Sequence, residues 1–256
     1  MNIQSASQAL LDAEKNKIPI EPFTSTTKIS VDDAYHIQLL QIQKKLENAN
    51  LVGMKIGLTS KVMQDMFGVD SPDFGHILNN MVFENNSVVS VSNFISPKVE
   101  FEIAFILREG LQGPNITAEH VLKATEAVVP AIEIIDSRIR DWKFRFEDTV
   151  ADNGSSAGAI LGDVHSQPTM DELANIKIIA MKNGSVFDEG ISNAVMENPA
   201  KAVAWLANML AAYDITLKAG QFILSGAITA AVPFESGDVF EIDYGPYGHM
   251  KVTFSD

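Results

Sequence analysis

Apolar residues recur at helical spacing in several segments of the chain. This pattern predicts a helix over residues 5–15 and another over residues 31–46, the second preceded by Ser30. Asp33 follows Ser30 by three residues, which is the pattern of a capping box with Asp in place of Glu. Further helices are predicted over residues 61–67, 117–127 and 199–213, and Asn198-Pro199 opens the last of them.

Short runs rich in branched residues predict strands between and after these helices. They cover residues 51–58, 88–91, 99–107 and 128–135. Asn183-Gly184 separates two further runs and predicts a tight hairpin, and residues 221–254 predict three or four strands joined by Gly-rich turns. Strands and helices do not alternate in the second half. The pattern therefore favours an α+β fold with a mixed or antiparallel sheet over a doubly wound one.

Composition narrows the class of protein further. The chain has 256 residues, of which 46% are hydrophobic and 20% charged, so it is long enough to bury a core without cross-links. Cysteine is absent, which excludes a disulfide framework, a thiolate metal site and a cysteine nucleophile. No apolar run is long enough to span a bilayer and the first residues do not form a signal peptide. We expect a cytoplasmic protein with no membrane partner.

The net charge of −14 bears on the ligands that the chain can bind. Acidic surfaces repel phosphate backbones, so nucleic acid is not an expected partner. A carboxylate substrate would also be repelled at long range, and a local cation or metal would have to overcome that repulsion.

Two glutamates stand in one of the most apolar predicted strands. Because side chains alternate along a strand, Glu100 and Glu102 share a face that is otherwise apolar. Glu133 lies in a second apolar run, residues 128–135. Neighbouring buried carboxylates cost energy unless a cation lies between them, and oxygen ligands suit Mg²⁺ or Mn²⁺. The alternative is that all three face solvent on half-exposed strands.

Lys55 is a single cation in another apolar strand, and it shares its face with Gly53 and Gly57. The glycines leave room for a ligand, so Lys55 is a candidate for orienting a carboxylate or for acid–base work. The alternative is a packed stem with its ammonium in water. Asp73 lies in a turn-rich loop, residues 70–75, where a structural and a catalytic role are equally consistent with the sequence.

Small polar residues mark two more candidate segments. Asp152-Asn-Gly-Ser-Ser156 offers hydroxyls and backbone donors, and Ser225-Gly-Ala-Ile-Thr229 has the small residues of a pocket wall. Phosphate-binding glycine motifs and a serine nucleophile elbow are absent, and the histidines are scattered. Nucleotide cofactors and a histidine metal site are therefore not expected.

Several longer segments, taken together in their order along the chain, carry a family resemblance. They are GMKIGLTS, GVDSPDFG, SPKVEFEIAFIL, VVPAIEIIDSRIRDW, DTVADNGSS and LSGAITAAVPFESGD. The chain resembles the 2-oxopent-4-enoate (vinylpyruvate) hydratases and the related 4-oxalocrotonate decarboxylases of the fumarylacetoacetate hydrolase superfamily. The resemblance implies a mixed β-roll over residues 81–256 with a smaller N-terminal α/β portion over residues 1–80, or one continuous domain, and a homo-oligomer.

The same resemblance assigns roles to individual residues. Glu100, Glu102 and Glu133 match the family's ligands for Mg²⁺ or Mn²⁺. Lys55 and Asp73 match its catalytic lysine and aspartate. Two serines match substrate-binding positions, namely Ser156 and Ser225.

The resemblance implies a small 2-oxo acid as substrate, and it leaves more than one reaction open. The first is addition of water to 2-hydroxypenta-2,4-dienoate; the alternatives are decarboxylation of 2-oxohex-3-enedioate and hydration of a seven-carbon oxo-dioate. A dioate needs a second cation, and a basic cluster follows Glu133, although we expect it to be a solvated surface. Its members are Arg138, Arg140, Lys143 and Arg145. A silent partner paired with a hydratase or decarboxylase relative is a further alternative.

Overall fold

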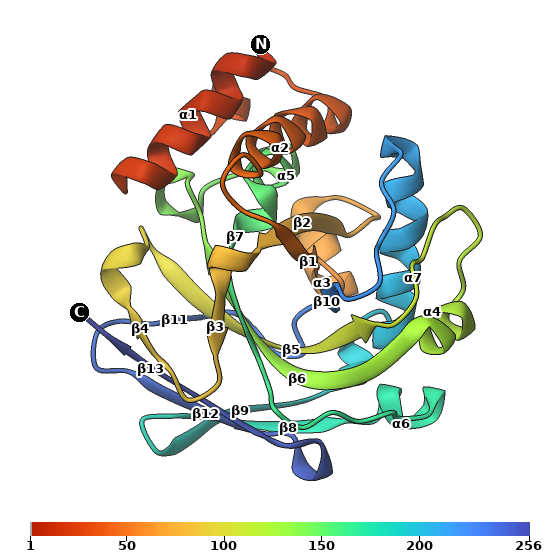
Figure 1. Ribbon diagram of the computed structural model, residues 1–256. Coiled ribbons are helices and arrows are strands. Elements are labelled where there is room, and N and C mark those ends of the chain that lie inside the picture. The colour runs from red at the N-terminus through yellow and green to blue at the C-terminus, as the bar shows by residue number, and fades with distance from the viewer. Residues whose placement is uncertain (1) are drawn as a thin grey trace.

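The computed structural model describes residues 2–256 and contains two sheets flanked by helices (Figure 1). The helices are α1 (Ile3–Asn16), α2 (Val31–Lys45), α3 (Lys61–Phe67), α4 (Ala118–Ala124), α5 (Phe146–Ala151), α6 (Met170–Ala174) and α7 (Pro199–Leu210). The strands of the larger sheet are β1 (Leu51–Gly57), β2 (Asp73–Leu78), β3 (Val82–Glu84), β5 (Pro97–Leu107), β6 (Thr125–Asp136), β7 (Ser156–Leu161), β10 (Phe222–Leu224) and β11 (Val232–Pro233). The smaller sheet contains β4 (Val88–Ser90), β8 (Lys177–Lys182), β9 (Ser185–Ile191), β12 (Val239–Asp243) and β13 (His249–Ser255).

The larger sheet has the strand order β2-β1-β10-β5-β6-β7-β3, with β11 paired to β5. Parallel pairs (β1 with β10, β3 with β7) and antiparallel pairs (β5 with β6, β6 with β7) occur together, so the predicted mixed sheet is confirmed. The five-stranded sheet lies below it in Figure 1, and α1, α2 and α5 gather at the opposite end. None of the helices over residues 2–256 combines the length and hydropathy that a bilayer span requires.

The main core lies between the two sheets. On β5, Val99, Phe101, Ile103 and Phe105 all point into it, and Phe101 lies 6.1 Å from Phe240 of β12, measured between ring centroids. The opposite face of β5 carries Glu100, Glu102 and Ala104, as the alternation in the sequence predicts. Along β5 and β6, one face is thus apolar and packs into the core, and the opposite face can carry functional side chains.

Helix α2 is fixed to β2 and to α5 by buried amides. Gln38 of α2 donates hydrogen bonds to the carbonyls of Phe74 (2.9 Å) and Val150 (2.7 Å), and Gln41 donates to that of Ala151 (2.7 Å). The capping box predicted at the start of α2 is confirmed. Since β1 and β2 belong to the same sheet as β5, that sheet runs across residue 80, and a division there stays a prediction.

Two local predictions were wrong. The helix expected over residues 117–127 ends at Ala124, and Thr125 begins β6. Residues 73–75 were expected in a turn-rich loop, but Asp73 begins β2, which pairs antiparallel with β1. The strand that pairs with β2 is distant in the sequence, whereas the turn-forming residues around Pro72 are adjacent to Asp73. The local sequence pattern therefore indicated a turn. This pairing carries Asp73 into the interior, directly opposite Gly57.

Candidate active site

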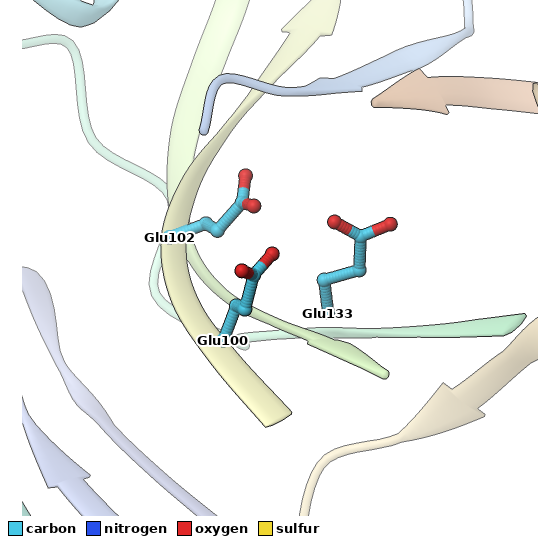
Figure 2. A group of neighbouring side chains, drawn as sticks. All are labelled: Glu100, Glu102 and Glu133. Carbon is cyan, nitrogen blue, oxygen red and sulfur yellow. The ribbon is translucent and has the colours of Figure 1, made fainter. Parts of the chain in front are cut away.

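Strand pairing brings the three predicted glutamates together. Glu100 on β5 stands directly opposite Glu133 on β6, and Glu102 follows two residues along the same face of β5. One carboxylate oxygen from each lies within 4.8 Å of the others. Figure 2 shows the three side chains turned toward a shared space between the strands. The alternative in which all three face solvent is wrong, because Glu102 and Glu133 are fully buried.

The buried carboxylates lack the hydrogen-bond donors that such groups ordinarily need. Oε1 of Glu102 and both oxygens of Glu133 accept no hydrogen bond, whereas Oε2 of Glu102 accepts one from the Gly226 N–H at 2.7 Å. Burial raises the pKa of Glu133 to about 8, and burial with the neighbouring carboxylates raises that of Glu102 well above its usual value. Unsatisfied, mutually repelling oxygens of this kind fit a divalent cation, which would reverse both effects. The three glutamates could therefore hold a metal ion.

Lys55 lies beside this cluster. Its ammonium donates a hydrogen bond to the Gly154 carbonyl at 3.0 Å and lies 3.4 Å from Oε2 of Glu133. Burial opposes its charge, but the surrounding carboxylates, Glu133 first, hold the pKa of Lys55 above the usual value. The side chain is only 3% exposed, so the alternative with its ammonium in bulk water is wrong.

Asp73 reaches the same space from β2. Its carboxylate is buried, and its Oδ1 accepts no side-chain hydrogen bond. Burial raises its pKa, while Lys55 opposes that rise. A Cβ on Gly57 would overlap the Asp73 carboxylate and lie 3.1 Å from the Lys55 ammonium. Glycine at position 57 thus leaves room for both the Asp73 carboxylate and the Lys55 ammonium.

A buried ion pair fixes the segment that follows α5. The guanidinium of Arg138 donates to Asp152 Oδ1 at 2.5 Å and to the backbone carbonyls of Asp136 (2.6 Å) and Ser156 (3.1 Å). Arg138 is 4% exposed, so its expected place on a solvated surface was wrong. The network holds the residues between Asp152 and Ser156, including the Gly154 carbonyl that binds Lys55.

The two predicted serines lie near the site, but neither hydroxyl lines its cavity. Ser156 begins β7, with a buried hydroxyl close to Glu133, and the residue on the cavity wall is its neighbour Ser155. The hydroxyl of Ser225 donates to the Ile103 carbonyl at 2.8 Å. Thr229 lines the cavity with an unpartnered, buried hydroxyl. Ser155 and Thr229 are thus candidates that sequence reasoning missed, although both lie in segments that it singled out.

A cavity of about 490 Å³ opens onto this cluster. Lys55, Asp73, Lys98 and Glu100 lie on its wall, and most of the remaining surface is apolar. The apolar part comes from α3, from the segment that includes Trp142, and from the segment after β10. Its larger side chains are Val62, Met63, Met66, Phe67, Ile135, Trp142, Phe144 and Ile228. The site can therefore hold a small molecule with one oxygen-rich end and one hydrocarbon end.

Comparison with known proteins agrees with the family resemblance expected from the motifs. A model described as fumarylacetoacetate (FAA) hydrolase C-terminal matches residues 59–255. A 2-hydroxyhexa-2,4-dienoate hydratase from Comamonas testosteroni is 41% identical and a 2-keto-4-pentenoate hydratase from Paraburkholderia xenovorans (strain LB400) is 39% identical; the alignments cover 99% and 98% of this chain and 98% and 94% of those proteins. The solved 4-oxalocrotonate decarboxylase from Pseudomonas putida G7, complexed with magnesium and adipate, is 33% identical, with a TM-score of 0.93 over 98% of this chain and 97% of that one.

Proposed function

The chain belongs to the fumarylacetoacetate hydrolase family, and from this membership and the site we propose that it is a metal-dependent hydratase. Its substrate in this proposal is 2-hydroxypenta-2,4-dienoate, and its product is 4-hydroxy-2-oxopentanoate. Two relatives at about 40% identity are a 2-hydroxyhexa-2,4-dienoate hydratase and a 2-keto-4-pentenoate hydratase. The observation that carries the proposal is the grouping of three neighbouring carboxylates, two of them buried with unpartnered oxygens, with Lys55 and Asp73 at one end of a small-molecule cavity.

We propose that Glu100, Glu102 and Glu133 hold Mg²⁺ or Mn²⁺. The donor set consists of carboxylate oxygens alone, which suits these hard cations better than zinc or copper. When bound, such an ion acts as a Lewis acid for the negative charge that develops at the substrate's 2-oxygen. The Gly226 N–H keeps Glu102 oriented, and Lys55 keeps Glu133 oriented.

The remaining roles fall to the chain's own polar groups. Lys55 is a fixed cation beside the glutamates and is suited to holding the substrate carboxylate. Asp73 has a free carboxylate oxygen next to Lys55 and is suited to carrying protons to and from the carbon chain. The hydroxyls of Ser155 and Thr229 face the same cavity and are available to position water.

The proposed reaction balances as the net addition of one water molecule. The 2-hydroxyl loses its proton and becomes the 2-oxo group, while C5 gains a proton and becomes a methyl group. The hydroxyl of water then bonds to C4, and C3 gains the second proton. Every proton transfer stays within the substrate, the water and Asp73, so no redox partner is required.

An ultraviolet assay with added Mg²⁺ tests the proposal. We expect rapid loss of the dienoate absorbance with the wild-type protein and none with Glu102→Gln, which keeps the side-chain shape. Glu126→Gln is the matched control, because Glu126 lies on β6 with Glu133 but is exposed. No loss of dienoate absorbance with the wild-type protein would contradict hydration of this substrate.

Decarboxylation is the second candidate, supported by the similarity to 4-oxalocrotonate decarboxylase over the whole chain. Release of CO₂ from 2-oxohex-3-enedioate, without loss of the dienoate, would move the assignment to that reaction. Turnover of neither substrate would instead support the silent-partner alternative.

We also propose that the protein is a homo-oligomer in a reducing cytoplasm. Apolar side chains are exposed on β9, the outer strand of the smaller sheet, and suit burial against another copy. They are Val186 (63% exposed), Phe187 (39%) and Ile191 (45%). Light scattering after size exclusion gives the mass in solution; a monomer at micromolar concentration would contradict the proposal.

A further inference from the structure

We propose that Lys98 is the residue that selects the tail of the substrate, by binding a terminal carboxylate on a six- or seven-carbon 2-oxo acid. The inference rests on the proposed function, because it assumes that the oxo-acid end of the substrate lies at the glutamates. It extends that function from a five-carbon monoacid to dicarboxylic substrates.

The position of Lys98 on β5 sets the length of substrate that it could meet. Lys98, Glu100 and Glu102 occupy alternate positions, so all three share one face of the strand. Two residues of strand advance about 6.6 Å. A chain of about four or five carbon–carbon bonds, at roughly 1.5 Å each, covers a comparable distance. A molecule that starts at Glu100 and lies along β5 therefore ends near Lys98.

Lys98 is also a cavity-lining cation without an ion-pair partner in the described part of the chain. Lys55, the other lining cation, is engaged by Gly154 and Glu133. Over residues 2–256, no carboxylate lies within ion-pair distance of the Lys98 ammonium, which instead rests 4.0 Å from the centre of the Trp142 ring. The net charge of −14 shows that acidic side chains are plentiful, yet none of those described pairs with Lys98. A half-buried, unpaired lysine that faces a cavity is suited to binding an anionic ligand.

The surroundings of Lys98 are held in place and are apolar. The Trp142 indole N–H donates to the Ser96 carbonyl at 2.9 Å. Asp141 and Trp142 both adopt left-handed backbone conformations, with φ of 58° and 56°, which non-glycine residues keep only when their surroundings fix them. Phe144 packs on Trp142 at 6.0 Å and Phe67 of α3 packs on Phe144 at 5.8 Å, between ring centroids. The cavity thus offers hydrocarbon contact along its wall and one positive charge at Lys98.

The basic cluster downstream of Glu133 does not provide this charge. Arg138 is buried against Asp152, Arg140 pairs with Glu21 and Lys143 pairs with Asp141. None of these three side chains lines the cavity, and neither does that of Arg145, the fourth member of the cluster.

Kinetics with two substrates test the proposal directly. In Lys98→Met, which keeps the side-chain length, we expect kcat/KM for 2-oxohept-4-ene-1,7-dioate to fall roughly ten- to hundredfold, the range of a hydrogen bond to a charged group. The value for 2-hydroxypenta-2,4-dienoate should change less than threefold. Lys98→Arg keeps the charge and should retain most of the dioate activity. An equal fall for both substrates in Lys98→Met would overturn the selective role.

Binding gives a readout that does not depend on turnover. In a Trp205→Phe background, Trp142 is the remaining tryptophan and lies against Lys98, so its fluorescence reports ligand at this place. With Mg²⁺ present, adipate should bind at least tenfold more tightly than hexanoate, which has the same carbon number and one carboxylate. Lys98→Met should abolish the difference. Equal binding of the two acids by the protein with Lys98 intact would overturn the proposal.

The two failures remain distinguishable. Hydration of the dienoate without an adipate preference would refute the role of Lys98 and leave the proposed function standing. An adipate preference that disappears in Lys98→Met, in a protein that hydrates nothing, would refute the hydratase and support the Lys98 site.

Discussion

Replacing Asp152 by asparagine would leave the Arg138 guanidinium buried without its counter-charge. Arg138 is 4% exposed and Asp152 is fully buried, so water cannot reach the pair to compensate. The Asp152 carboxylate also accepts hydrogen bonds from the Arg138 backbone N–H at 2.9 Å and from the Ser137 hydroxyl at 3.2 Å. Asparagine preserves the shape and one acceptor oxygen but removes the negative charge.

The expected cost follows from the burial of both groups. Removing one partner of a buried ion pair typically destabilises a protein by about 3–5 kcal/mol. The carbonyls of Asp136 and Ser156 still accept from Arg138 in the variant, which favours the lower end of that range. We therefore expect Asp152→Asn to lower the free energy of unfolding by about 3 kcal/mol. Activity should fall as well, because the same network holds the Gly154 carbonyl against Lys55.

Urea unfolding at pH 7 and fixed protein concentration measures this difference. Glu21→Gln is the matched control, because it breaks the Arg140–Glu21 pair in the same region, where the side chains are 50% and 71% exposed. The control should change the free energy of unfolding by less than about 1 kcal/mol. If Asp152→Asn is no less stable than Glu21→Gln, the Arg138–Asp152 pair does not stabilise the fold as argued.

Three further predictions concern the metal site, its neighbours and pH. Mg²⁺ at 100 times its Kd should stabilise the wild-type protein by about 2.7 kcal/mol and so raise its Tm, but it should not raise the Tm of Glu133→Gln. Equal Tm shifts of the two proteins in calorimetry would argue against the site. Gly57→Ala should reduce kcat by about 100-fold, because its Cβ would displace the Asp73 carboxylate, and unchanged kcat would refute that geometry. Burial lowers the pKa of His76 to about 4, whereas the pKa in the unfolded chain is about 6.5. The unfolded chain therefore binds a proton more readily, and the stability that neutral His76 contributes above pH 6.5 is lost as the pH falls toward 4. Between pH 7 and 4 the wild-type protein should lose about 3 kcal/mol more stability than His76→Gln in urea titrations, whereas parallel curves would contradict the assignment.

The carboxylate cluster was predictable from the sequence because strand periodicity alone determines one part of it. Glu100 and Glu102 must share a face wherever β5 lies, and the apolar residues on the other face must be buried. The partnership with Glu133 needed only the further step of pairing two long apolar strands. The mixed sheet and most helices followed from equally local signals.

Other parts of the site depend on contacts that local patterns do not encode. Asp73 lies beside turn-forming residues, and only the pairing of β2 with β1 reveals it as part of a buried strand. Ser156 was chosen from the sequence but Ser155 lines the cavity, because the left-handed conformations of Asn153, Gly154 and Ser155 break the alternation before β7. Arg138 belongs to a run of charged residues typical of a surface, and only Asp152, 14 residues later, explains its burial.

The pairing of β5 with β6 also links metal binding to correct folding. If these strands were misaligned by one residue, Glu100 would no longer stand opposite Glu133. The carboxylates of one strand would then point toward the phenylalanines of the core. Such misaligned states cannot gather three carboxylates around one ion, so an ion held by these glutamates would stabilise the native alignment and none of its near neighbours. A divalent cation present during refolding should therefore favour the native alignment of β5 and β6. It should raise the yield of native protein, and not only the stability of protein that is already folded.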